Sequence, residues 1–501
     1  MLPQWLHTFT TWLRPEPPSV PPLARWLDRP HLAELYQWDM AALPPFVQES
    51  AAALKYRALL GELDWGHFPE RPKNRAWPGP TPAPRTPFVA AYLVKLDKGL
   101  PSMPKLCEYL GEQPGLVWLL GFPLTPSLHY SWGFDVAASL PSSHQFSRIL
   151  RELCPEQVSF LLKSTVLLLD QELATLPEEV SLPRFGDEIS LDTKHILAWV
   201  RENNPKDYVP DRFDKTRQPK GDPDCKLGCK KRRNTSSPEG PTAEGQPTPT
   251  QEAIPASQTE KGEFYWGYAS GVVATKVGDW GEFVLAEYTQ TFDQSDPSYF
   301  FPLLNQTEQN LRRMPRFGAF DGAFDAFYVY EYFHKAGGFA AVPYAGRADH
   351  AKTFDVDGLP LCAAGLAMPL KSTFQKKSHC LVPHECGRHA CPLLFPAATG
   401  ESCPVHHENW NKEGCITTLP TSIGNRIRYQ LDRHSHAYTQ LYNQRTATER
   451  INSQAVELGI ERPKLRNQRS IANQNTLTYV LINLRGLQRL RQRTAELTAP
   501  A

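Results

Sequence analysis

The sequence predicts an α/β protein in which a mixed sheet flanked by helices follows an all-helical N-terminal domain. Three observations support this prediction. Apolar residues recur at three- and four-residue spacing from 88 to 180, strand and helix patterns alternate from 185 to 349, and an irregular Cys/His-rich insertion at 350–437 interrupts that alternation. The chain of 501 residues is long enough for two or three domains, and its 47 prolines predict long connections between them.

Charge is balanced overall but unevenly distributed. Lys and Arg number 54 against 53 Asp and Glu, yet residues 421–501 hold thirteen basic and five acidic side chains. Such a segment suits a polyanion such as DNA, although a solvated basic face would give the same counts. No apolar run reaches the roughly 18 residues of a membrane span. With no signal-peptide pattern and five of ten cysteines crowded into 380–415, we expect a cytoplasmic protein with reduced thiols.

The N-terminal part divides into two segments by pattern. Residues 1–87 combine short helical stretches with Pro-rich extended pieces, and residues 88–180 read as a compact helical domain. Within it, Ser142 or Ser143 is a suitable N-cap for the amphipathic helix that follows. Arg148 and Arg151 would lie on an exposed face of that helix, which fits either a DNA-binding helix-turn-helix or a plain helical bundle.

The α/β part begins with the stretch GDEISLD, which alternates apolar and polar residues and predicts a strand that ends at Asp192. Residues 204–261 lose periodicity and predict a disordered linker. A hairpin around 277–279, a helix, a short strand before Asp321 and a helix at 324–335 follow. The residues after the insertion, 438–495, complete this part with two helices, the second of them basic.

The first of these two helices contains the segment YNQRTATERINS. In helical geometry Tyr442, Arg445 and Glu449 fall at i, i+3 and i+7, which places a phenol, a guanidinium and a carboxylate on one face. That face could meet a metal ion and a phosphate together. An ordinary solvated amphipathic helix would show the same spacing, so the interpretation depends on partners elsewhere in the chain.

Two aspartates at predicted strand ends supply such partners. Asp192 and Asp321 would lie side by side if the first and fourth strands are neighbours, as they are in an RNase H-like sheet, and the late helix would add Glu449. Three clustered carboxylates repel one another unless divalent cations bind, so the set predicts two Mg²⁺ or Mn²⁺ ions. Asp187, Glu188 and Asp325 are rival carboxylates, but they sit earlier in the strand or inside the next helix.

These motifs, taken in order, resemble the insertion-sequence transposases with an RNase H-like DDE domain. ISLDTKHI carries the first aspartate, FGAFDGAFDAFYVY is similar to the family's D-x-x-[YF]-D motif, and YNQRTATER matches its Y-x2-R-x3-E signature. FDVDGLPLCAAGLAM with CPLLFPAATGESCP is similar to the Cys-rich insertion of one branch. The resemblance covers about 185–495. It departs from the pattern at Val456, where some relatives carry a lysine, so that the basic contact would come from Arg450 or from elsewhere in the chain.

The resemblance implies a DNA transposase that binds terminal inverted repeats, cleaves DNA by metal-dependent hydrolysis and joins the freed 3′ hydroxyl to target DNA. Asp192, Asp321 and Glu449 would hold the two metal ions, Arg445 would contact a phosphate, and Tyr442 would orient the DNA end. The partners would be double-stranded DNA and a second copy in a homodimer on DNA. An inactive DNA-binding descendant, or a nuclease without strand transfer, remains an alternative.

The cysteines of the insertion form a second candidate site. Cys386, Cys391 and Cys403 are the candidates for structural zinc, with the fourth ligand undetermined, because thiolates suit zinc. The spacings match no common zinc finger. Reduced cysteines that pack the insertion without metal are the alternative.

Overall fold

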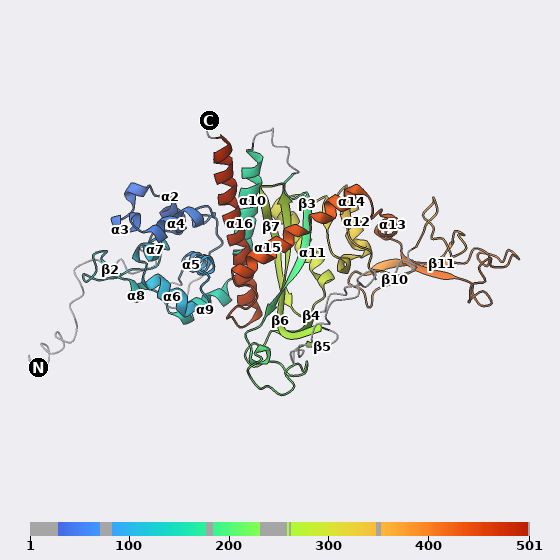
Figure 1. The fold of residues 1–501 in the computed structure, drawn as a ribbon, viewed down its shortest axis with the longest axis horizontal. Helices are drawn as coiled ribbons and strands as arrows, with labels where there is room; N and C mark the ends of the chain where they lie inside the picture. The colour runs from blue at the N-terminus through green and yellow to red at the C-terminus, as the bar shows by residue number, and fades with distance from the viewer. Residues whose placement is uncertain are drawn as a thin grey trace, which may run out of the picture. The chain divides into compact units, whose positions relative to one another are not determined.

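The structure is a computed structural model. It describes residues 29–70, 83–176, 184–230, 262–346 and 352–498, and the backbone of 258–259. Two compact units divide between Leu161 and Leu162, inside helix α10, Pro155–Ala174 (Figure 1). The sequence predicted a boundary near 180 instead. The second half of α10 belongs with the sheet because the side chains of Val166 and Leu169 are buried in the sheet's hydrophobic core.

The first unit is helical, as the sequence predicted. The segment 29–70, which the sequence set apart from the domain at 88–180, packs in the same unit: the Tyr56 hydroxyl donates to the Asp97 carboxylate at 2.8 Å. Ser142 is the N-cap predicted for α9, since its hydroxyl accepts the Gln145 N–H at 3.2 Å. The main helices of the unit are α2 Leu32–Gln37, α4 Ala51–Leu60, α5 Thr86–Asp97, α6 Met103–Gly111, α7 Pro114–Leu119 and α9 Ser143–Glu152.

The second unit is built on a mixed sheet with spatial order β7-β6-β3-β8-β9. The long strand β6 runs antiparallel to both neighbours, whereas β8 and β9 run parallel to β3. Two shorter strands, β4 and β5, also pair with β6. This arrangement confirms an α/β protein with a mixed sheet. The strands are β3 Glu188–Leu197, β4 Lys226–Lys230, β5 Gln258–Thr259, β6 Gly262–Val277, β7 Gly281–Thr291, β8 Phe317–Ala319 and β9 Phe339–Ala341.

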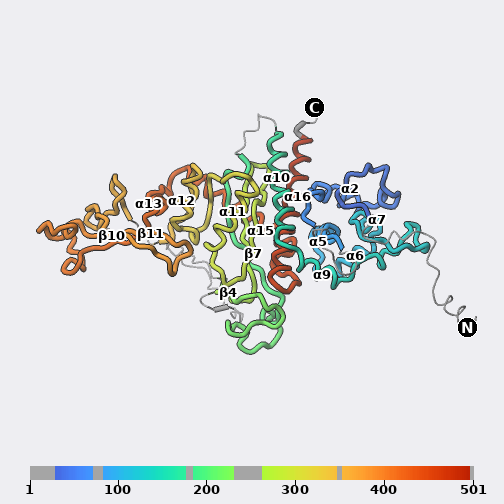
Figure 2. The backbone as a smooth tube through the Cα atoms, turned by 180° about the vertical axis from the view of Figure 1, so that it is seen from behind, coloured from blue at the N-terminus to red at the C-terminus, as the bar shows by residue number. Residues whose placement is uncertain are grey.

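Helices cover both faces of the sheet. On one face α11, Phe300–Leu311, approaches closely because Gly271 of β6 has no side chain: a Cβ there would lie 2.4 Å from the Tyr299 ring. On the other face lie α15, Thr446–Glu457, and α16, Gln468–Thr498. Figures 1 and 2 show α16 beside α10. Asn483 of α16 connects the two helices to β7. Its side-chain oxygen accepts the Val284 N–H of β7, and its side-chain nitrogen donates to the Val284 carbonyl and to the Thr165 hydroxyl of α10.

Several local predictions were wrong in detail. β3 continues past Asp192 to Leu197, because β6 pairs with it over this whole length. Residues 204–230 are not a disordered linker: they form β4 and a loop held to β6, where Trp266 donates its indole N–H to the Arg212 carbonyl at 2.7 Å. The rest of the predicted linker, residues 231–257 and 260–261, lies outside the described residues.

Two predicted helices are divided. A 3-10 turn, Gly322–Phe324, precedes α12, which spans Phe327–Lys335, so Asp325 lies between helices. Tyr442 belongs to α14, His436–Asn443, whereas Glu449 belongs to α15. No helix in the described part of the chain has both the length and the apolar character that a membrane span requires.

The Cys/His-rich insertion contains more regular structure than the sequence predicted. Its three strands, β10 Leu370–Lys376, β11 His384–Ala390 and β12 Ile416–Pro420, form an antiparallel sheet of their own. Helix α13, Ile423–Gln430, then returns the chain to α12, and the two helices pack tightly. The insertion therefore has a sheet of its own and joins the rest of the second unit through the contact between α12 and α13.

Candidate active site

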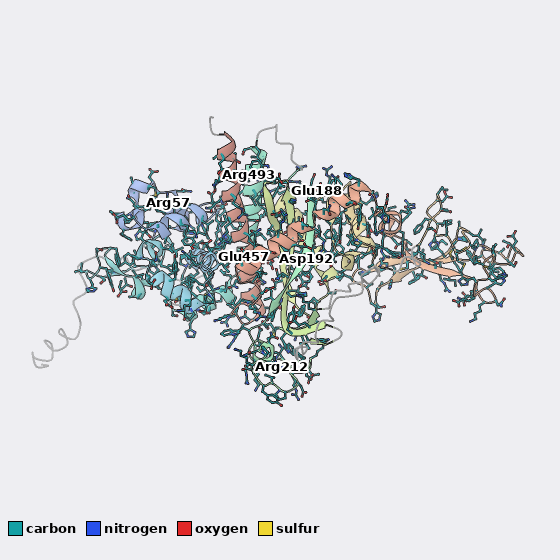
Figure 3. The ribbon with its side chains drawn as sticks, in the orientation of Figure 1. Arg57, Glu188, Asp192, Arg212, Glu457 and Arg493 are labelled. Atoms are coloured by element: carbon teal, nitrogen blue, oxygen red, sulfur yellow. The ribbon has the colours of Figure 1, made fainter. Side chains whose placement is uncertain are left out.

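Strand register brings the two predicted aspartates to the same level. β3 and β8 pair in parallel with Ser190 opposite Ala319. Asp192 and Asp321 each lie two residues further along, Asp192 within β3 and Asp321 just after the end of β8, so the parallel register brings them to the same level. Figure 3 labels Glu188 and Asp192, at the start and in the middle of β3.

Asp192 is largely buried, and its charge is disfavoured. The pKa of its carboxyl is raised to about 6, chiefly by burial; Asp321 and Asp296 also raise it, whereas the Thr193 backbone N–H and the Arg445 guanidinium lower it. A carboxylate that is buried beside other carboxylates is a favourable ligand for a divalent cation, which would offset their repulsion.

Asn452 is a site residue that sequence reasoning missed. It lies one turn after Glu449 on α15, and its amide nitrogen donates to Asp192 Oδ2 at 3.0 Å across 260 residues of chain. This hydrogen bond fixes α15 over the middle of β3. The only signal in the sequence was the i+3 spacing from Glu449, because an uncharged amide is common on helix surfaces.

Arg445 links the helix to the aspartates. Its guanidinium donates to Glu449 Oε1 at 2.8 Å, lies 5.9 Å from the Tyr442 ring centre and interacts electrostatically with Asp192. Tyr442 stacks on Tyr438, with ring centres 5.8 Å apart. The three residues predicted to share a helical face therefore do lie together, although a junction between α14 and α15 separates Tyr442 from Glu449.

The other predicted contact, Arg450, lies elsewhere. Its guanidinium pairs with Glu282 of β7 at 2.5 Å, and its side chain is 61% exposed. Within the described residues, Arg450 links α15 to β7 through this ion pair instead of contacting Asp192 or Asp321. A role in binding DNA would require this ion pair to open.

Two of the rival carboxylates have structural partners. Asp187 pairs with Arg316 at 2.6 Å. Asp325, whose side chain is fully buried, pairs with Arg428 at 2.6 Å and accepts hydrogen bonds from the Tyr330 hydroxyl and the Ala345 N–H. Although burial raises its pKa, these partners lower it below the usual value overall. Both carboxylates are therefore occupied with holding the fold together.

The oxygens around Asp192 fit a hard cation. In the described part of the chain, Oδ1 of Asn452 and Oγ of Ser190 are buried without a hydrogen-bond partner, and both residues belong to the elements that hold Asp192. Carboxylate, amide and hydroxyl oxygens suit magnesium and its bound waters. Among the described residues, no three His, Cys, Asp or Glu side chains already converge on a single metal position. Glu449, paired with Arg445, would have to turn inward.

A basic cleft lies at the end of β3 that follows Asp192. It has a volume of about 970 Å³, and six Lys or Arg side chains line it against three Asp or Glu. Arg466 lies 5.0 Å from the ring centre of Trp199, whose side chain is half exposed. Arg212, labelled in Figure 3, is on its wall. The basic residues are Arg201, Arg212, Arg217, Lys220, Arg462 and Arg466.

The cysteines predicted to bind zinc do not all lie together. Cys386 is on β11, opposite Phe374 of β10. Cys391 and Cys403 instead line a small cavity with Cys362 and Cys415. Cys362 belongs to the stretch FDVDGLPLCAAGLAM of the predicted Cys-rich insertion, but it lies ahead of the five cysteines at 380–415 and was not among the zinc candidates.

The chain matches no protein-family model and no curated protein. The geometry of the site therefore carries the functional argument.

Proposed function

We propose that this chain is a DNA transposase whose α/β unit is an RNase H-like catalytic domain. The observation that carries the proposal is the parallel register of β3 and β8, which brings Asp192 and Asp321 to the same level, with Asp192 hydrogen-bonded to Asn452 of α15. The aspartates are far apart in sequence, and α15 comes from near the end of the chain. Three segments in this order match the motifs that resemble DDE transposases.

The strand order supports the same proposal. Apart from the short strands β4 and β5, the first strand of the sheet, β3, neighbours the fourth, β8, as expected for an RNase H-like sheet. The second strand, β6, is antiparallel to both β3 and β7. Fold alone does not define an activity, so the carboxylates remain the stronger argument.

The residues of the site have distinct roles in this proposal. Asp192 from β3, Asp321 from the turn after β8 and Glu449 from α15 would hold divalent cations. Bound magnesium would supply activation of the attacking oxygen and stabilisation of the leaving oxygen in phosphodiester displacement. Asn452 is a positioning residue, because its hydrogen bond orients the Asp192 carboxylate.

Arg445 connects metal binding with DNA binding. In the structure it is the counter-charge of Glu449, with its side chain 28% exposed. Once Glu449 turns toward a cation, the guanidinium becomes available for a DNA phosphate, which it can bind with two hydrogen bonds. The adjacent Tyr442 ring would then limit where the DNA end lies.

The basic cleft supplies a path for the DNA beyond the site. Its excess of cations would attract the phosphate backbone, and the exposed Trp199 beside Arg466 offers a surface for stacking. In the helical unit, Arg148 and Arg151 of α9 are exposed and would add a second DNA contact. The proposal includes a homodimer on DNA, as the family resemblance implies.

The proposal is tested with purified protein and a duplex that carries the inverted repeats flanking the coding region. We expect Mg²⁺-dependent cleavage at the repeat ends and joining of the 3′ end to a second duplex. Asp192→Ala, Asp321→Ala and Glu449→Ala should each bind the duplex and fail to cleave it. Binding without cleavage by the wild type would favour the inactive DNA-binding alternative, and cleavage without joining would favour a nuclease.

A further inference from the structure

Four cysteines of the insertion meet at one cavity, which the candidate active site does not use. Cys362, Cys391, Cys403 and Cys415 all line it. The cavity volume is about 10 Å³, the least that a single water molecule needs. A space of that size is too small for an organic ligand but can hold a single ion. Within the described residues the four thiols do not yet converge on one metal position, so they would have to turn inward to bind it.

The backbone around these cysteines folds into tight turns. The Cys362 carbonyl accepts the Gly365 N–H at 2.9 Å, and Gly365 has a positive φ of 74°. After Cys403, the His406 N–H bonds back to the Cys403 carbonyl, and the His407 N–H donates to the Cys403 sulfur at 3.5 Å. A backbone N–H directed at sulfur stabilises a thiolate, which is the form that binds metal.

The loop that carries three of these cysteines has little else to hold it. Between β11 and β12, in the stretch 391–415, the buried residues are Cys391, Leu393, Cys403 and Gly414. A Cβ at Gly414 would lie 2.7 Å from the Cys391 Cβ, so these two parts of the loop touch. A loop of this length without helix or strand lacks the apolar burial that would order it, and small segments of this kind are commonly stabilised by a structural metal.

We propose that Cys362, Cys391, Cys403 and Cys415 form a tetrathiolate zinc site that stabilises the insertion. Four sulfur ligands with no open position define a structural site. On binding, each thiol loses its proton to solvent and the four thiolates turn inward around one Zn²⁺, which leaves the oxidation states unchanged. This set replaces the prediction of Cys386, which stays outside the cavity on β11. The proposal is independent of the transposase function.

Zinc content of the purified full-length protein tests the site. We expect about one zinc ion per chain, lost in Cys362→Ser and Cys415→Ser and retained in the matched control Cys386→Ser. Cobalt substituted for zinc should give the intense thiolate absorption of a tetrahedral site. Because a serine variant could fail to fold, Cys403→His provides a second reading: histidine is also a zinc ligand, so this variant should keep the metal.

Three results of the zinc measurements would overturn the site. These are a wild-type protein without zinc, zinc that persists in Cys362→Ser and Cys415→Ser, and zinc that is lost in Cys386→Ser. A disulfide between Cys391 and Cys415, seen by mass spectrometry in protein purified without oxidation, would equally contradict it. DNA cleavage assays remain a separate measurement, so failure here leaves the function proposed for the α/β unit intact.

Discussion

Asp192 is the residue whose chemistry most directly reports on the proposed metal site. Its pKa of about 6 in the fold lies above the usual 3.8, chiefly because of burial. A carboxyl whose pKa is raised by folding destabilises the fold when it ionises. In the metal-free protein, the stability that the protonated Asp192 carboxyl contributes is therefore lost as the pH rises from about 4 to about 6.

Asp192→Asn should accordingly stabilise the metal-free protein above pH 6. We expect a gain of about 1–3 kcal/mol at pH 7 and almost none at pH 4, because the buried carboxyl is ionised at pH 7 and protonated at pH 4. Mg²⁺ should raise the melting temperature of the wild type but not of Asp192→Asn. Thermal unfolding with and without Mg²⁺ measures both effects. The exposed Asp357→Asn is the control, and an equal response to Mg²⁺ in Asp192→Asn would contradict the assignment.

Asp325 should behave as a structural residue, although it belongs to the motif of the second aspartate. Asp325→Ala leaves Arg428 partly buried without its partner, which should cost about 3–5 kcal/mol of unfolding free energy. Urea unfolding measures the loss. Lys335→Ala, which breaks an exposed pair with Glu331, is the control and should cost less than about 1 kcal/mol. Normal stability with lost cleavage would instead make Asp325 catalytic.

At the scale of elements, the contact between α12 and α13 decides how the insertion is attached to the sheet. Gly424 permits the contact, because a Cβ there would lie 2.0 Å from the Phe327 carbonyl oxygen. Gly424→Ala should separate the helices and cost about 1–3 kcal/mol. Thermal unfolding compares Gly424→Ala with the control Gly111→Ala, because a Cβ at Gly111 would have no atom within 4 Å. Equal stability of the two variants would show that α13 can shift without cost.

The pattern of apolar residues predicted the mixed sheet and its flanking helices, but not where the elements end. β3 was expected to stop at Asp192 because polar residues follow. They remain in the strand because backbone pairing with β6 holds them there. Residues 204–230 were expected to be disordered because they are polar and Pro-rich, yet the loop is fixed by contacts with Trp266 and Tyr268. Such tertiary contacts leave no periodic signal.

The site was predictable to the extent that charge and order along the chain define it. Asp192, Asp321, Arg445 and Glu449 were found because carboxylates and arginine at fixed spacing are chemically distinctive. Asn452 was not, since its partner is 260 residues away in sequence. Cys362 was missed for the same reason: only tertiary folding brings its turn to the cavity that the later cysteines line.

At the scale of the whole molecule, the basic cleft should contribute to DNA affinity without regard to sequence. Replacing Arg462 and Arg466 together by Ala should weaken binding and reduce the slope of log affinity against log salt by about 1–2. Fluorescence anisotropy across a salt series measures both quantities, with Lys335→Ala as the control. An unchanged salt slope would exclude the cleft from the DNA path.

The most direct test of the central claim is Mg²⁺-dependent cleavage by Asp192→Asn, Asp321→Asn and Glu449→Gln, measured beside DNA binding in the same preparations. These variants keep the size of each side chain and remove its charge. We expect each to bind the repeat-end duplex as the wild type does and to cleave it about 1,000-fold more slowly or worse, the scale of losing a catalytic group. Wild-type cleavage by any of the three would contradict the three-carboxylate site.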